Sequence, residues 1–215
     1  MAASISWTID PRVSAAVQSN LLDLARHHHA LAQKQGGDAD RDAAVRWYRE
    51  IVASFPNDAA AAQNQFLLAE LLYENQRFDE AAVEYDKAAY DMPRHDRSAD
   101  AAYTALLARA QMEKRAPAAE LPALQRAATD SALRFGETFK TDPRVGPVLT
   151  LAAEKLFAKP DHDAAERVAQ QVLALDPPAA AEQRRVASTV AAHVAFEKNR
   201  FADAERGYAQ VLALT

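Results

Sequence analysis

The chain has 215 residues with a formal net charge of −5, so it lacks the basic surplus of proteins that bind nucleic acid through its phosphates. It has no cysteine, which excludes disulfides, thiolate metal sites and thiol nucleophiles. No apolar run approaches the roughly 18 residues that a transmembrane helix requires. The sequence is rich in alanine and has only 5 glycines, a composition that suits closely packed helices.

Helix start and stop signals recur along the whole chain. Asp10-Pro11 supplies an N-cap and a proline at the first helical position, and Gly36-Gly37 ends that helix. Asn57-Asp58 is expected to cap the third helix. The period-2 runs and Asn-Gly or Asp-Gly turns typical of strands are missing from the sequence. We therefore expect an all-α fold, with helices over about 10–35, 40–54, 58–73, 78–91, 98–115, 123–140, 146–158, 161–175, 179–198 and 201–214.

A degenerate phrase recurs in the sequence. Its clearest copy is NQRFDEAAVEYDKAAYDMP, residues 75–93, and the closest echo is NRFADAERGYAQVLALT, residues 199–215. Weaker echoes end at Pro56, Pro143 and Pro177, and the terminal prolines are separated by 37, 50 and 34 residues. Such a period indicates stacked helical hairpins. We expect a tail over 1–10 and a single stack over 11–215, with repeats at about 11–56, 57–93, 94–143, 144–177 and 178–215.

The repeats resemble the tetratricopeptide repeat (TPR), and this resemblance implies a right-handed α-solenoid of about five hairpins. In the second repeat the family's slots hold Leu68, Ala69, Tyr73, Phe78, Ala81, Tyr85, Ala88 and Pro93. In the third, the small-residue slot falls on either Ala105 or Leu106. The remaining repeats match at Leu21, Leu24, Ala25, Ala44, Tyr48, Ile51 and Pro56; at Ala152, Ala153, Leu156, Ala165 and Pro177; and at Ala191, Ala192, Phe196, Phe201, Ala204 and Tyr208.

A narrower similarity concerns the compartment. The spacing from Tyr48 to Pro56 and from Tyr85 to Pro93 is similar to that in bacterial cell-envelope TPR proteins of the BamD and CpoB type. This similarity implies a periplasmic scaffold. The start of the chain has neither a basic leader nor an apolar core. The compartment therefore stays unknown, with a periplasmic or envelope-associated location favoured over the cytoplasm if a leader has been removed.

Two clusters invite a metal-site interpretation. His27, His28 and His29 are consecutive, so on a helix they point about 100° apart and cannot share one ion. We favour packing and surface roles, with His28 in the buried aromatic slot and His29 on the groove side; a metal or pH-sensing role is the alternative. In 161–163, Asp-His-Asp, we favour a capping box of Asp163 with Glu166 over metal binding. We predict no metal and no cofactor.

Catalytic motifs are missing from the sequence. It contains no G-x-S-x-G, no H-E-x-x-H and no glycine-rich phosphate loop. Gly136 and Gly207 lie inside helical patterns, where glycine costs about 1 kcal/mol relative to alanine, and we expect them to permit close helix contacts. We predict that the protein is not an enzyme and has no catalytic residue.

The TPR resemblance places a binding groove on the first helix of each hairpin. Aromatic rings there alternate with carboxylates, which suits an extended protein segment with basic and apolar side chains. Aromatics in these slots also serve packing alone, and that interpretation stays open. The Lys/Asn carboxylate clamp of chaperone-binding TPRs is replaced here by Gln63, Phe66 and Glu70. The candidate partner-binding residues are Arg26, His29, Gln63, Phe66, Glu70, Tyr73, Glu74, Glu154, Phe157, His193, Phe196 and Glu197.

The function that the sequence favours is a non-catalytic protein–protein interaction scaffold, binding a polypeptide on its concave face in a bacterial envelope complex. The alternative is a regulatory or substrate-presenting TPR region of a larger enzyme. We expect no nucleic-acid partner and no membrane span. We also expect the natural protein to continue beyond Thr215, leaving Tyr208, Val211 and Leu212 partly uncovered and prone to self-association.

Overall fold

The computed structural model describes residues 10–35, 37–159 and 161–214. In that part of the chain there are ten α-helices and one π-helical turn, and no strand, so the all-α prediction is confirmed. Residues 1–9 of the predicted tail over 1–10, and the helix stop at Gly36, lie outside the described residues. The elements are α1 (Pro11–Gln35), α2 (Asp38–Ser54), α3 (Ala61–Glu74), α4 (Phe78–Asp86), η1 (Lys87–Asp91), α5 (Ser98–Arg115), α6 (Leu121–Thr138), α7 (Val145–Phe157), α8 (His162–Leu173), α9 (Ala181–Glu197) and α10 (Phe201–Ala213).

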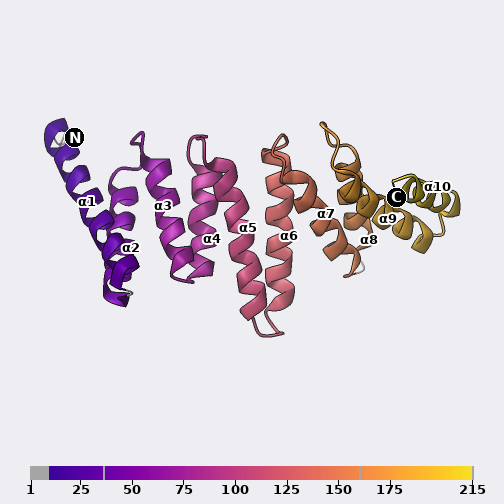
Figure 1. Cartoon of the computed structure of the whole chain (residues 1–215), viewed down its shortest axis with the longest axis horizontal. Coiled ribbons are helices and arrows are strands. Elements are labelled where there is room, and N and C mark those ends of the chain that lie inside the picture. The colour runs from indigo at the N-terminus through magenta and orange to yellow at the C-terminus, as the bar shows by residue number, and fades with distance from the viewer. Residues whose placement is uncertain (1–9, 36, 160, 215) are drawn as a thin grey trace, which may run out of the picture. The chain divides into compact units, whose positions relative to one another are not determined.

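The chain divides into two compact units, residues 1–111 and 112–215. The first holds α1 to α4, η1 and most of α5, and the second holds α6 to α10. Within each unit consecutive helices run in opposite directions as hairpins (Figure 1). The second helix of one hairpin packs on the first helix of the next, as α2 does on α3, α6 on α7 and α8 on α9. Hairpins stacked in this order are the TPR-like arrangement that the sequence predicts.

The core of the first unit combines a few large rings with alanines. Tyr48 and Tyr85 are both almost fully buried, at 2% and 0% exposure, in the corresponding slots of α2 and α4. Each lies one turn after a fully buried alanine, Ala44 or Ala81. Ala105, at 0% exposure, rather than Leu106, fills the small slot of α5, which resolves the register of the third repeat.

The core of the second unit is dominated by small side chains. Ala153, Ala165, Ala169 and Ala187 are all 0% exposed, as is Val172 at the end of α8. Side chains of this size let α7, α8 and α9 approach one another closely, and α9 contacts both of the others. Burying apolar surface contributes about 25 cal/mol per Å² to stability. Each hairpin gains this contribution only where a neighbouring hairpin covers its apolar face.

The two best copies of the repeated phrase form the same turn. Gln76 and Asn199 have positive φ values of 60° and 57°, the left-handed conformation common just after a helix. The next amide donates back to the helix in both places, from Arg77 to the Leu72 carbonyl and from Arg200 to the Ala195 carbonyl. A ring, Phe78 or Phe201, then opens the following helix. The two turns give a residue-by-residue alignment of α3–α4 with α9–α10, 123 residues later.

Most predicted helix ends agree with the structure to within three residues, but two capping predictions are wrong. Asn57-Asp58 does not cap α3, which starts at Ala61; Asp58 Oδ1 accepts from the Ala60 amide in the turn before it, at 2.8 Å. At α8 the cap is Asp161, whose Oδ1 accepts from the Ala164 amide at 3.3 Å. Asp163 and Glu166 form no capping box, because both bind Lys198 of the next hairpin.

Gly136 and Gly207 mark close helix contacts, as predicted. A Cβ atom on Gly207 in α10 would lie 2.8 Å from the Cβ of Ala192 in α9 and 3.2 Å from its Cα. On Gly136 in α6 it would lie 2.9 Å from Cδ2 of Leu149 in α7. At Gly207 the obstacle is the Ala192 Cβ, which cannot move without its backbone. At Gly136 the obstacle is the tip of the flexible Leu149 side chain.

We expect Gly207→Ala to destabilise the protein by about 1–2 kcal/mol, because overpacking outweighs the roughly 1 kcal/mol gained in helix propensity. Gly136→Ala should stay within about 1 kcal/mol of the parent, since Leu149 can change its rotamer. Urea unfolding of both variants measures the difference.

Ala192→Gly is the matched partner for this experiment. Combined with Gly207→Ala it restores the space between α9 and α10, so the double variant should be more stable than additivity predicts. Additive losses, or a Gly207→Ala variant as stable as the parent, would show that the close contact is not what requires glycine.

Candidate functional site

In the first unit, His29 of α1 meets Glu74 at the end of α3. His29 Nε2 lies 3.2 Å from Oε2 of Glu74, and the His29 ring contacts the edge of Tyr48 with centroids 6.3 Å apart. The expected places of the neighbouring histidines are partly wrong. The His28 side chain stays 27% exposed because its Nδ1 is held 2.8 Å from Asp40 Oδ1, whereas that of His29 is only 17% exposed.

The rings of α3 and α4 form a buried cluster beside this contact. Tyr73 meets Phe78 at 5.1 Å and Tyr85 at 6.4 Å, both edge to face. The Tyr85 hydroxyl donates to Glu70 Oε1. Burial and this hydrogen bond to a carboxylate both raise the pKa of Tyr85 far above its usual value, so the phenol stays protonated. Glu70 is therefore already occupied by an internal partner.

Phe66 does not lie on an accessible groove surface. Its side chain is 1% exposed, it contacts the Tyr85 ring at 5.6 Å, and the Arg97 guanidinium lies 3.7 Å from its ring centroid. Its predicted place on the contact surface is therefore wrong: neighbouring elements cover it. Arg26 and Gln63 are exposed on α1 and α3. Burial raises the pKa of Tyr48, and the nearby charge of Arg26 opposes that rise.

In the second unit, four aromatic rings, one each from α7, α8, α9 and α10, contact one another in a continuous row. Phe157 at the end of α7 stacks on His162 of α8 at 5.5 Å and on His193 of α9 at 5.7 Å. These contacts are nearly parallel, with interplanar angles of 21° and 23°. His193 then meets the edge of Tyr208 in α10 at 5.4 Å. We call these four residues the ring row.

Carboxylates and a further ring pair lie beside the ring row. Glu154 precedes Phe157 by three positions and Glu197 follows His193 by four, so each shares a helix face with a ring of the row. Both carboxylates are exposed. Phe196 and Phe201 contact each other edge to face at 5.7 Å and are 53% and 57% exposed. This face therefore offers ring surface and negative charge to solvent together.

A ring pair five positions apart closes three of the hairpins: Tyr73 with Phe78, Phe157 with His162, and Phe196 with Phe201. The end of one helix and the start of the next are thereby locked together. Sequence reasoning missed His162 as part of this pattern, because Asp-His-Asp draws attention as a set of metal ligands. Alignment of the turns alone identifies it, since His162 has the position of Phe78 and Phe201.

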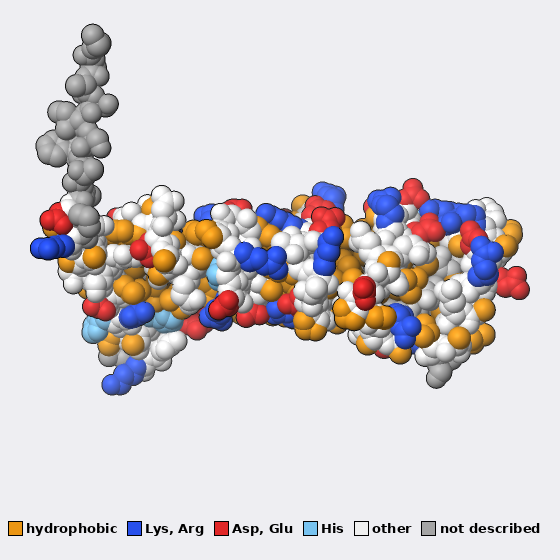
Figure 2. All heavy atoms as spheres, turned by 90° about the horizontal axis from the view of Figure 1, so that it is seen from above, with side chains coloured by type: hydrophobic (Ala, Val, Ile, Leu, Met, Phe, Trp, Pro, Cys, Tyr) orange, Lys and Arg blue, Asp and Glu red, His pale blue; other side chains and the backbone are white. Residues whose placement is uncertain are grey.

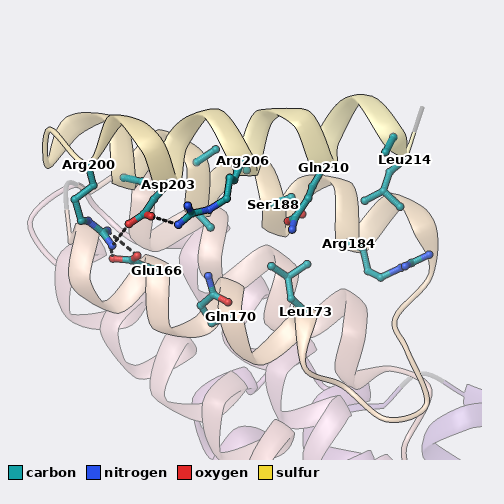
Figure 3. A pocket seen from close by; sticks show the side chains of 15 residues that line it. Glu166, Gln170, Leu173, Arg184, Ser188, Arg200, Asp203, Arg206, Gln210 and Leu214 are labelled. Carbon is teal, nitrogen blue, oxygen red and sulfur yellow. Dashed lines mark hydrogen bonds and ion pairs between the residues drawn. The ribbon is translucent and has the colours of Figure 1, made fainter.

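A cleft of about 620 Å³ lies on another side of the second unit, between α8, α9 and α10 (Figure 3). Ion pairs cross one end of it: Arg200 binds Glu166 at 2.6 Å and Asp203 at 3.6 Å, and Asp203 also binds Arg206. Amides, small side chains, two leucines and Arg184 complete the lining. The charges of the four ion-paired residues offset one another, whereas Arg184 adds a further positive charge, and its Nε is buried without a hydrogen-bond partner. No nucleophile in the lining is paired with a base. The complete lining is Glu166, Gln170, Leu173, Arg184, Ser188, Ala191, Ala192, Ala195, Arg200, Asp203, Arg206, Gly207, Gln210, Ala213 and Leu214.

The Glu166 carboxylate joins α8 to the α9–α10 turn. It accepts from Lys198 Nζ at 3.0 Å and from Arg200 Nη2 at 2.6 and 2.7 Å. Burial alone would raise the pKa of Glu166, but the hydrogen bonds from Arg200 and Lys198 outweigh it and hold that pKa below its usual value. The ionised form of Glu166 thus stabilises the stacking of one hairpin on the next.

Other functional classes find little support in the described residues. On the face in Figure 2, basic and acidic side chains are interspersed, so that view shows no continuous basic patch for nucleic acid. No group of three or more His, Asp or Glu in the described ranges is arranged to hold a metal ion. Among the helices of those ranges, none combines the length and apolarity needed to cross a membrane.

Comparisons with known proteins return similar folds only. No protein-family model matches the chain, and no curated protein matches its sequence. Similar solved structures include MamA protein (14% identity, 92% of this chain and 91% of that chain, TM-score 0.47), a tetratricopeptide repeat protein from Parabacteroides merdae (11%, 91% and 66%, 0.46) and a thermophilic TPR protein from Thermus thermophilus (18%, 92% and 91%, 0.39). Because each TM-score is below 0.5, the description as TPR-like rests on this chain's own hairpins.

Tyr85→Phe should destabilise the first unit by about 1–2 kcal/mol, because it removes a buried hydrogen bond to a carboxylate while keeping the ring contacts. Chemical denaturation measures the loss. Tyr208→Phe is the matched control, since the residue at the Glu70 position of that hairpin is His193, which contacts the Tyr208 ring edge to face. Equal losses for the two variants would contradict a specific role for the Glu70 contact.

Glu166 should make stability depend on pH. Its folded pKa is depressed, so its contribution is fully present above the unfolded pKa of about 4.3 and is lost as pH falls through the folded value. Glu166→Gln should therefore lower the melting temperature near pH 7. At low pH the melting temperatures of the variant and the parent should converge. A difference that stays constant from pH 7 to below pH 4 would contradict this role.

Proposed function

We propose that this protein is a non-catalytic protein–protein interaction scaffold that binds an extended polypeptide segment on the face carrying the ring row. The observation that supports this proposal is that the four contacting rings share their helix faces with two exposed carboxylates, Glu154 on α7 and Glu197 on α9. The partner segment has basic side chains for the carboxylates and apolar side chains for Phe196 and its neighbours.

The chemistry of this face favours arginine and lysine in the partner. Among the described residues, neither Glu154 nor Glu197 has an ion-pair partner, so both carboxylates are available to an incoming cation. Ring faces attract cations as well, most strongly when water is excluded. The chain already uses this geometry internally, where the Arg97 guanidinium lies 3.7 Å from the Phe66 centroid. A guanidinium can bind ring and carboxylate at once.

The equivalent face of the first unit is less suited to a partner. Glu70, Tyr73 and Glu74 have the positions of His193, Phe196 and Glu197 in the aligned hairpins. Yet Glu70 accepts from Tyr85, Glu74 contacts His29, and Tyr73 packs on two rings. Its polar groups are engaged internally, and exposed Arg26 adds a charge that repels basic partners. We therefore assign the contact to the second unit.

A place in a bacterial envelope complex is a finer part of this proposal. It is supported only by the similarity of the tyrosine-to-proline spacing to that of envelope TPR proteins. The binding chemistry of the ring row does not depend on it.

Selection of peptides from a random display library on the immobilised protein tests the binding chemistry. Enriched peptides should combine arginine or lysine with apolar residues, and their affinity should fall as salt is raised. Phe196→Ala should cost about 2 kcal/mol or more, as truncation of a central aromatic anchor commonly does. Glu154→Gln combined with Glu197→Gln should weaken binding and flatten the salt dependence.

The matched control neutralises two exposed carboxylates on α6, with Glu137→Gln and Asp130→Asn. It removes the same net charge and should leave peptide affinity within about twofold of the parent. Peptides without basic residues, or equal losses from both double variants, would show that the ring row face is not the binding surface.

A further inference from the structure

The cleft between α8, α9 and α10 contains hydrogen-bonding groups without internal partners. Ser188 of α9 is 2% exposed and lines the cleft, yet its hydroxyl forms no hydrogen bond within the described part of the chain. The amides of Gln170 on α8 and Gln210 on α10 have no partner there either, and both side chains point into the space between the two helices (Figure 3). Because a buried polar group is normally paired, Ser188 indicates a place for an incoming group.

The aligned α3–α4 hairpin shows what occupies the equivalent place. There the Glu84 carboxylate of α4 accepts hydrogen bonds from Gln65 Nε2 of α3 and from Lys87 Nζ, the latter at 3.0 Å. Gln65 is 3% exposed and the Glu84 side chain 13%, so this contact is largely shielded from water. A carboxylate held by two donors thus belongs to the packing of that hairpin.

In the α9–α10 hairpin the donors are retained and the carboxylate is missing. The same three positions, taken in chain order and 123 residues later, hold Ser188, Gly207 and Gln210. A serine hydroxyl and a glutamine amide can both donate to a carboxylate, whereas Gly207 has no side chain that could supply one. The two donors are therefore left without the acceptor that joins their counterparts.

Small side chains also widen the floor of this cleft. Ala191 and Ala195, which line it, have the positions of Leu68 and Leu72, and these leucines are 1% and 0% exposed in α3. The cleft of about 510 Å³ in the first unit is lined by residues of α2 and by Arg77, with none from α3. The smaller side chains of α9 therefore open a floor that the larger ones of α3 close.

The charge of the cleft favours an anion. Its lining carries three arginines and two carboxylates, and both carboxylates are ion-paired with arginine at one end. Arg184 supplies the remaining positive charge: it forms no ion pair within the described ranges, and its Nε is buried without a hydrogen-bond partner. Arg184 precedes Ser188 by four residues, so the two share a face of α9. A carboxylate bound to Ser188 lies one helical turn from this unpaired cation.

From this comparison we propose that the cleft binds a small aliphatic carboxylate. The ligand's carboxylate accepts from the Ser188 hydroxyl and the Gln210 amide, as Glu84 does from its two donors. The hydrocarbon chain lies on Ala191 and Ala195. The cleft volume of about 620 Å³ is within the usual range of small-molecule sites. No residue of the ring row lines the cleft, so this site does not depend on the proposed function.

Titration of the full chain with hexanoate, followed by ¹H–¹⁵N NMR, tests the proposal. Backbone signals of α8, α9 and α10 should shift in a saturable way, with a Kd of roughly 0.1–10 mM, as expected for a ligand of this size. Hexanamide has the same hydrocarbon chain without the charge, so it should bind at least about tenfold more weakly.

Variants of the lining locate the contact. Ser188→Ala and Gln210→Ala each remove one donor and should weaken hexanoate binding by about fivefold. Gln210→Glu places a like charge beside the ligand and should weaken it by about tenfold or more. Ala191→Leu restores the side chain of the α3 position and should abolish binding by filling the floor. Gln171→Ala is the matched control, because Gln171 is an exposed glutamine of α8 that lines the cleft beside α6, and its Kd should equal that of the parent.

Three results would overturn the proposal. Absence of saturable shifts with hexanoate shows that the cleft does not hold a carboxylate. Equal affinities for hexanoate and hexanamide show that the hydrocarbon chain alone is bound. Hexanoate affinity that Ser188→Ala and Gln210→Glu leave unchanged places the contact elsewhere on the protein. Circular dichroism establishes that each variant is folded, and if Ala191→Leu is not, the variants of the exposed Gln210 decide the test.

Discussion

The packing of each hairpin against its neighbour is the interaction on which the rest of this structure depends. A pair of short amphipathic helices cannot bury its apolar face alone, so the free energy that stabilises it comes from the hairpins before and after. The chain meets this requirement with very small side chains, such as Ala69, Ala153 and Ala187 at 0% exposure. Between α9 and α10 even a methyl group is too large, and Gly207 lies against Ala192.

Close packing also decides where functional groups can be. Rings such as Tyr48 and Phe66 are buried within helices, but where alanines fill the helix middles, other large side chains lie at the helix ends and the turns. The ring pairs Tyr73–Phe78, Phe157–His162 and Phe196–Phe201 are all found there. In the two aligned hairpins, a backbone turn with one residue in the left-handed conformation holds the rings in place. The same local arrangement of turn and rings thus packs internally in one hairpin and is exposed to solvent in another.

The two aligned hairpins show how a repeat acquires a function without changing its fold. Glu70 in α3 accepts from Tyr85, whereas His193, at the same position in α9, presents its ring to Tyr208. One exchange of side chain converts a satisfied internal hydrogen bond into part of a stacked row. Glu197 then remains available, although its counterpart Glu74 is held by His29. The difference between a structural and a binding face is therefore one of which polar groups have internal partners.

The same distinction explains how much the sequence could predict. Helix positions, the fully buried Tyr48 and Tyr85 slots and the close-contact glycines follow from local periodicity and residue size, and the structure agrees with them. The burial of Phe66 under Arg97 and the binding of Asp163 to Lys198 depend on residues 31 and 35 positions away. No local rule specifies which of several nearby cations a carboxylate will meet. An Asp-x-x-Glu pattern favours a capping box, but a lysine on the next hairpin competes for the same oxygens, and Asp161 satisfies the helix end instead. In a stacked-hairpin protein, prediction from sequence is therefore most reliable for the groups that pack within a hairpin and least reliable for the charged groups that connect one hairpin to the next.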